Sequence, residues 1–157
     1  NLKIPNVADI NEINGEFLLI FNTFSLESEY TVSYVKPSSS STLSKSSYKF
    51  FAYYGTLSWF ITGEHKNYVL SKTTFDRVTP KRNFGKDSGF GAIELSLRYS
   101  YFNLNNADLK GGIMSDITGG INWYLNPAVK VAINYVYSDV KNLGKANIFQ
   151  MRFQIAF

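Results

Sequence analysis

The sequence predicts an all-β protein, a transmembrane antiparallel β-barrel, on three observations. Apolar and polar residues alternate along several segments, as is typical of strands that have two different surroundings. Aromatic residues make up 17% of the 157 residues while the mean hydropathy is only −0.13, so apolar side chains are spread along the chain instead of gathered in blocks. Tyrosine and tryptophan recur at strand ends, where a membrane barrel places them at its two water–lipid boundaries.

The first three predicted strands have a noisier alternation but can still be recognised. Along the second of them, leucine, valine and tyrosine alternate with Glu27, Glu29, Thr31 and Ser33. A tight turn at residues 22–24 separates the first two strands, and a Ser-rich connection follows the second. The three predicted strands are residues 15–22, 25–36 and 47–62.

The last four predicted strands alternate more strictly. In the final stretch, NIFQMRFQIAF, every second residue from Phe157 back to Phe149 is apolar. The apolar faces of these strands carry almost no charge, whereas the other faces hold charges and amides. The four predicted strands are residues 91–102, 113–126, 128–140 and 147–157.

A water-soluble β-sandwich is the alternative interpretation of such strands. Its interior would have to accommodate most of 11 Tyr and 13 Phe side chains. A barrel in lipid closes its sheet to satisfy every backbone group, and its strands need about 9–11 residues, which these segments reach. A membrane helix needs about 20 apolar residues, and the longest aliphatic–aromatic run is residues 17–21. We therefore favour the barrel, with outer-membrane lipid around it.

Outer-membrane barrels place both chain termini in the periplasm, which orients the strands. The final strand then runs toward the periplasm, and the turn at Asn126 and Pro127 is periplasmic. Residues 37–46, 103–112 and 141–145 become external connections. The external edge carries Tyr99, Tyr101, Tyr135 and Tyr137, and the periplasmic edge carries Trp59, Trp123 and Phe157.

Residues 62–89 lack alternation and are long for a connection inside one barrel domain spanning residues 1–157. The predicted topology places this segment on the periplasmic side, where turns are normally short. It holds six basic and three acidic residues, a net charge of +3 within a chain total of +4. We expect it to fold into the lumen or to contact a partner.

Several motifs, in this order, resemble the phosphate-selective porin O and P family of bacterial outer membranes. The two most specific are the turn NWYLNP at residues 122–127 and the loop PKRNF at residues 80–84. The others are GE at 15–16, FSL at 24–26, EY at 29–30, WFITGE at 59–64, RVT at 77–79, GAIEL at 91–95, RYS at 98–100, GI at 120–121 and NYV at 134–136.

The resemblance implies a 16-stranded porin, usually trimeric, that conducts small anions such as phosphate. This chain would supply its C-terminal seven strands, since bacterial single-chain barrels have even strand numbers and further strands would precede it. The family's phosphate-selecting basic cluster lies largely on a loop of that earlier half, so none of its residues is transferred here. No cofactor and no nucleic-acid partner is expected.

The candidates for lining the channel are charged side chains on the inward faces and on the 62–89 segment. Arginine suits phosphate because its planar guanidinium can donate two hydrogen bonds to one oxyanion. The inward acids Glu27, Glu29, Glu94 and Asp116 outnumber the inward bases of the strands, so anion preference rests on the loops and on the resemblance. Arg98 could instead pair with Glu94. The candidates are Arg77, Lys81, Arg82, Glu94, Arg98, Lys130 and Arg152.

Other functions have weaker support in the sequence. The single histidine, His65, has no serine–histidine–acid spacing around it, so an enzyme is not predicted. One histidine and no cysteine supply too few ligands for a transition-metal site. A structural or adhesive outer-membrane barrel that binds a partner through its external loops remains the alternative function.

Overall fold

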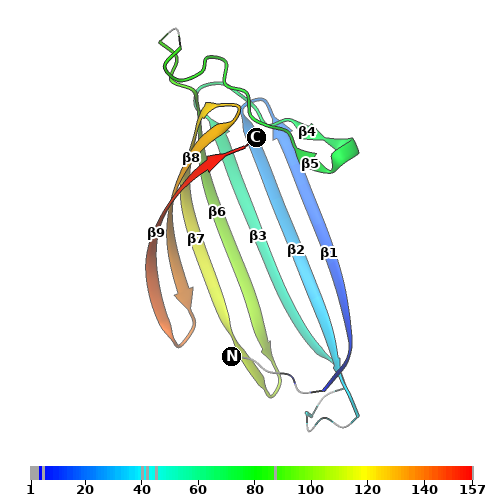
Figure 1. The fold of residues 1–157 in the computed structure, drawn as a ribbon. Coiled ribbons are helices and arrows are strands. Elements are labelled where there is room, and N and C mark those ends of the chain that lie inside the picture. Colours follow the sequence, from blue (N-terminus) through cyan, green and yellow to red (C-terminus); the bar gives the residue numbers. More distant parts are fainter. Residues whose placement is uncertain are drawn as a thin grey trace.

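The computed structural model describes residues 4, 6–39, 41, 43–44, 46–86 and 88–156, and the protein is all-β, as predicted. Seven antiparallel strands form one sheet in the order β1-β2-β3-β6-β7-β8-β9 (Figure 1). The predicted position of Phe157 lies outside the described residues. The seven strands are β1 (Val7–Phe21), β2 (Phe24–Pro37), β3 (Tyr48–Phe60), β6 (Ala92–Asn106), β7 (Leu109–Asn126), β8 (Val129–Val140) and β9 (Gly144–Ile155).

The sheet is an open meander in which each strand pairs with the next long strand of the chain. Within the described residues β1 and β9 each have one neighbouring strand, so the sheet has two edges and is not a closed barrel. Figure 1 shows β8 and β9 bending forward from the plane of the other strands. This curvature gives the sheet a concave side.

The register sorts side chains onto two unlike faces. Leu95 lies opposite Ile121 of the next strand, Ile121 lies opposite Ile133, and Ile133 lies opposite Met151. We call this the apolar face; many of its large side chains are exposed, including Phe153 at 60%. The other, the polar face, is the concave one, because its residues from β2 through β9 line a single cavity. Alternation predicted that apolar and polar residues lie on opposite faces of the sheet, and this sorting is confirmed.

Short turns connect neighbouring strands, β1 to β2 and β7 to β8, at the end of the sheet where β9 finishes. Asn22, in the β1–β2 turn, has a φ of 56°, in the left-handed region that asparagine tolerates better than most residues. In the β7–β8 turn the side-chain oxygen of Asn126 accepts backbone hydrogen bonds from Ala128 at 2.8 Å and Val129 at 2.9 Å. This side-chain-stabilised turn is the structural basis of the Asn-Pro pair in the sequence.

The strands extend further than predicted at the opposite end. The predicted loop at residues 103–112 is wrong: β6 and β7 continue through it and meet at a tight turn at Ala107 and Asp108. A register shift between Asn103 and Asn105 interrupts the ladder there, and asparagine side chains take over its hydrogen bonds. Asn103 Oδ1 accepts from the Asn105 amide at 2.9 Å, and Asn105 Oδ1 accepts from the Gly112 amide at 2.8 Å.

The edge strands also begin earlier than predicted. β1 begins at Val7 rather than residue 15, and β9 begins at Gly144 rather than residue 147. The added residues alternate poorly, but they pair along the full length of the neighbouring strand, so backbone pairing determines their structure.

The 62–89 segment contains a small hairpin that the sequence did not predict. Strands β4 (Tyr68–Val69) and β5 (Thr74–Phe75) pair across the 3-10 turn η1 (Leu70–Lys72). Two-residue strands are too short to show alternation, which explains why they were missed. Among the described residues, no helix is both long and apolar enough to cross a membrane.

The Asn126 turn gives a test of the fold. Asn126→Ala removes the acceptor for two backbone amides, and we expect a loss of about 1 kcal/mol in the free energy of unfolding. Asn126→Asp keeps an acceptor oxygen and serves as the matched control. Urea titration of the full-length protein refolded into vesicles measures both; equal stability of N126A and N126D would contradict the role given to the side chain.

Candidate functional site

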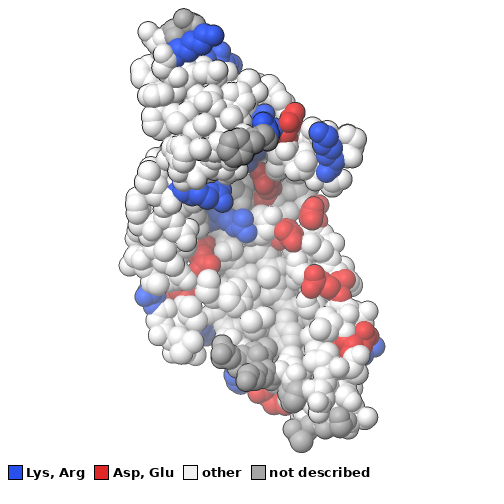
Figure 2. Space-filling model, in the orientation of Figure 1, with Lys and Arg blue, Asp and Glu red and all other residues white. Residues whose placement is uncertain are grey.

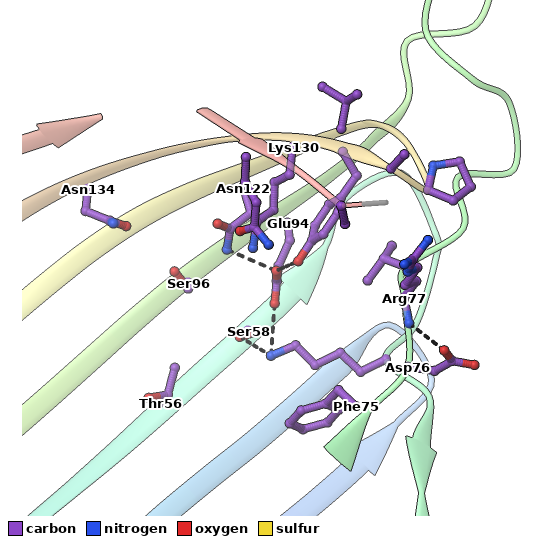
Figure 3. A pocket seen from close by; sticks show the side chains of 18 of the residues that line it. Thr56, Ser58, Phe75, Asp76, Arg77, Glu94, Ser96, Asn122, Lys130 and Asn134 are labelled. Carbon is purple, nitrogen blue, oxygen red and sulfur yellow. Dashed lines mark hydrogen bonds and ion pairs between the residues drawn. The ribbon is translucent and has the colours of Figure 1, made fainter. Parts of the chain in front are cut away.

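A cavity of about 560 Å³ lies on the polar face, near the end of the sheet where β9 finishes. Its walls combine polar-face residues of six strands with residues 75–78 of the long segment (Figure 3). This part of the 62–89 segment therefore lies against the concave face of the sheet at this end.

Lys66 attaches this segment to the polar face. Its Nζ lies 2.7 Å from Glu27 Oε1 on β2 and 3.0 Å from Glu94 Oε1 on β6. It also donates a hydrogen bond to Ser58 Oγ on β3 at 3.2 Å. Only 15% of its side chain is exposed. One ammonium group thus joins three strands to the segment.

Glu94 is the buried centre of the cluster, with 2% of its surface exposed. Its second oxygen accepts hydrogen bonds from Asn122 Nδ2 at 3.0 Å and from the Tyr124 hydroxyl at 2.9 Å. A buried carboxylate is costly unless it is paired and hydrogen-bonded, and these contacts supply both. We call Glu27, Ser58, Lys66, Glu94, Asn122 and Tyr124 the Lys66 network.

The protonation of Lys66 follows from its surroundings. Burial lowers the pKa of Lys66, but the charges and hydrogen bonds of Glu94 and Glu27 act in the opposite direction and outweigh it. The net result is a pKa raised above the ordinary value of 10.5. The side chain is therefore a cation at neutral pH and remains one to higher pH than an isolated lysine.

Four of the predicted channel-lining residues come together at this cavity: Arg77, Glu94, Arg98 and Lys130. The guanidinium of Arg98 lies 3.7 Å from the ring centroid of Tyr54, and Lys130 Nζ lies 5.2 Å from that of Tyr124. Both are cation–π contacts. The basic partner of Glu94 is Lys66, not Arg98: four residues along a strand span about 13 Å, too far for that ion pair.

The other three predicted residues lie elsewhere. Lys81 and Arg82 line a second cavity, of about 280 Å³, on the far part of the long segment. Arg152 is exposed on the edge strand β9, opposite Ala132 in register. The positive charge of the 62–89 segment is consequently divided between the two cavities and the exposed Lys72 of η1.

Comparison with known proteins identifies the family. The sequence matches the family described as phosphate-selective porin O and P over residues 3–157. The chain belongs to this family. It is 28% identical over 104 residues to Porin O of Pseudomonas aeruginosa and 30% identical over 90 residues to an uncharacterized protein of Caulobacter vibrioides.

These alignments cover 60% and 57% of the chain, but only 23% and 18% of the two relatives, so the chain spans about a fifth of their length. Homologues in the porin O and P family are outer-membrane porins of Gram-negative bacteria, and the bacterial outer membrane is the location of this chain.

In this porin-family chain the WFITGE motif holds both ends of the long segment in place. Thr62 Oγ1 accepts a hydrogen bond from the backbone amide of Ile93 at 2.9 Å and donates one to Glu64. The buried Glu64 then accepts from the Lys81 amide at 3.0 Å. These side chains bring the start of the segment, its middle and the following strand together.

The sequence interpretation missed several residues of the site. Lys66, Asn122 and Tyr124 were not singled out, although Lys66 contacts Glu27, Ser58 and Glu94. Its position next to the motif glutamate Glu64 was a usable signal, but its ionic partners lie on strands far away in the sequence. His65, which is adjacent to Lys66 in sequence, is exposed.

The ion pairs of Lys66 give a pH-dependent test. Because folding raises the pKa of Lys66, its stabilisation is complete below the ordinary value of 10.5 and is lost as pH rises through the raised value. Lys66→Gln leaves Glu27 and Glu94 without their cation, so we expect a loss of about 3 kcal/mol at neutral pH.

The difference between wild type and K66Q should stay constant through neutral pH and shrink only above pH 10.5. Urea midpoints of the full-length protein measured across this range provide the check. Lys72→Gln, an exposed change on the same segment, is the control and should alter stability by less than about 0.5 kcal/mol. A K66Q protein as stable as K72Q would contradict the network.

Proposed function

We propose that this chain forms part of a water-filled outer-membrane porin through which small anions, phosphate-like in charge and size, diffuse passively. The observation that carries the proposal is the two-faced sheet: an exposed apolar face on one side and a charged concave face on the other, in a chain of the porin O and P family. Such a sheet suits a barrel wall, with lipid outside and water inside.

The unpaired edges of β1 and β9 support the presence of further strands. An exposed sheet edge cannot persist in hydrocarbon, because its backbone N–H and C=O groups would have no partner. We propose that additional strands of the full-length protein pair with both edges and close the barrel. By analogy with the family, we propose a total of 16 strands and a trimeric assembly.

The long segment narrows the periplasmic end of the proposed lumen. Lys66 and residues 75–78 reach the concave wall, where they form one side of the cavity. Four basic and three acidic side chains line this cavity, for a net charge of +1. Two of the acids, Glu27 and Glu94, are bound by Lys66, and we propose that the charges of Arg98 and Lys130 attract the anion.

Single-channel recording tests the proposed transport. Full-length protein in a planar bilayer should give stepwise conductance, and its reversal potential under a salt gradient should indicate anion preference. The double variant R98Q/K130Q removes two cavity cations and should shift the reversal potential toward cation permeation. K110Q/K141Q removes two exposed cations near the opposite end of the sheet and is the matched control.

If the wild-type channel were cation-selective, the proposal of a phosphate-like substrate would be wrong, but the proposal that the protein is a porin would stand. Protein that assembles in the membrane, binds an envelope or host partner and conducts nothing would favour the adhesive barrel.

The orientation of the sheet in lipid is tested at two adjacent residues of β7. Ile117 is on the apolar face, 49% exposed, and Thr118 lines the cavity. Arginine at a lipid-facing position near the membrane centre costs about 2–4 kcal/mol. We expect that loss for I117R and little loss for T118R in urea titrations from vesicles. Equal losses would contradict the assignment of the two faces.

A further inference from the structure

Residues 79–86 and 88–90, which we call the basic lobe, are attached to the apolar-face side of the sheet. The ring of Phe84 packs edge-on against Trp123, with centroids 5.0 Å apart and planes at 87°. Trp123 Nε1 donates a hydrogen bond to the Phe90 carbonyl at 2.6 Å. Trp123 belongs to the apolar face, opposite Ile93 on one side and Val131 on the other. The lobe is therefore attached to the outer surface of the sheet.

Backbone contacts fix the shape of the lobe. The Phe84 amide donates to the Leu125 carbonyl at 2.8 Å, and the Gly91 amide donates to the Arg82 carbonyl at 3.2 Å. Gly91 has a φ of 75°, and a Cβ there would lie 2.2 Å from the Tyr124 carbonyl oxygen. Only glycine permits this close approach of the lobe to β7.

The lobe presents basic and aromatic side chains next to each other. Lys81, Arg82 and Lys86 are exposed and line the cavity of about 280 Å³, together with Asn83 and Pro127. Figure 2 shows basic side chains gathered at this tip, beyond the strand ends seen in Figure 1. The acidic residue of the lobe sequence, Asp87, lies outside the described residues. Phe84 is 51% exposed and Phe90 is 74% exposed.

We propose that the basic lobe binds the headgroup phosphate of an anionic phospholipid in the periplasmic leaflet. The inference rests on the proposed membrane orientation, which puts Trp123 at the water–lipid boundary. Lysine and arginine just outside that boundary attract anionic headgroups, and aromatic rings collect at the same level. The phosphate contacts Lys81, Arg82 and Lys86, while the acyl chains run along Phe84, Phe90 and Trp123.

A lipid fits this surface better than a free anion does. A dissolved phosphate needs donors but no apolar contact, whereas here two exposed phenylalanines stand beside the basic residues and continue the apolar face. The lobe also lies outside the concave cavity that lines the proposed pore. Its charges are thus placed to meet the membrane surface and not the permeating ion.

Fluorescence quenching of Trp123 tests the site directly. Full-length protein is reconstituted into phosphatidylcholine vesicles that contain dibrominated phosphatidylglycerol or dibrominated phosphatidylcholine. The contribution of Trp123 is obtained by subtracting the fluorescence of the W123F variant from that of the wild type. We expect the brominated phosphatidylglycerol to associate about tenfold more strongly than the phosphatidylcholine, and the variant K81Q/R82Q/K86Q to bring that ratio close to one.

The matched control is K72Q/K110Q/K141Q, which removes three exposed cations elsewhere and should keep the preference. If the triple lobe variant does not assemble, K86Q alone should still lower the ratio by about two- to threefold. Equal quenching by the two lipids in wild type, or an unchanged ratio in a lobe variant that assembles, would overturn the proposal. Complete competition by inorganic phosphate at matched ionic strength would assign the site to a free anion instead.

Conductance recorded from the same preparations separates this inference from the proposed function. If the protein conducts anions but shows no lipid preference, the proposed porin function stands and the lipid site is wrong. If it does not conduct but prefers the anionic lipid, the lipid site stands and the porin function is wrong. The lobe variant is expected to conduct like wild type, because its three residues lie outside the concave cavity.

Discussion

The rest of the structure depends on one constraint: an antiparallel backbone ladder has to keep two unlike faces of the sheet apart. Strand side chains point alternately to the two faces, so a one-residue slip between neighbours would exchange apolar and charged groups along a whole strand. The register from β1 to β9 keeps them apart, with Leu95, Ile121 and Ile133 in one row. Short turns and asparagine side chains complete the backbone hydrogen bonding where the ladder ends or shifts.

Because the ladder leaves charged groups on its concave side, those groups require partners of their own. Glu94 is the extreme case, since it is almost fully buried and accepts hydrogen bonds from two side chains besides its contact with Lys66. Satisfying this carboxylate is what draws the long segment onto the sheet. The same contact that stabilises the fold therefore also determines the shape of the cavity.

The parts of the fold that obey local rules could be predicted from the sequence, and the parts that depend on distant contacts could not. Alternation located all seven long strands, and the Asn-Pro pair located a turn. Alternation did not predict the strand structure of residues 103–112, where asparagine side chains replace ladder hydrogen bonds, or the short β4–β5 hairpin. For the site, alternation placed Glu94, Arg98 and Lys130 on one face. Lys66 could not be placed in this way, because its segment has no alternation of apolar and polar residues.

The path of the long segment separates its charges. The segment carries +3 in the sequence, and we expected it to fold into the lumen or to contact a partner. Arg77 lines the concave cavity, but a few residues later Lys81 and Arg82 line the second cavity, and Phe84 packs against Trp123 of the apolar face. Charges so close in sequence thus act on different surroundings. We therefore propose that ion selectivity in this chain depends on Arg98 and Lys130, whereas the basic lobe forms the proposed lipid site at the membrane surface.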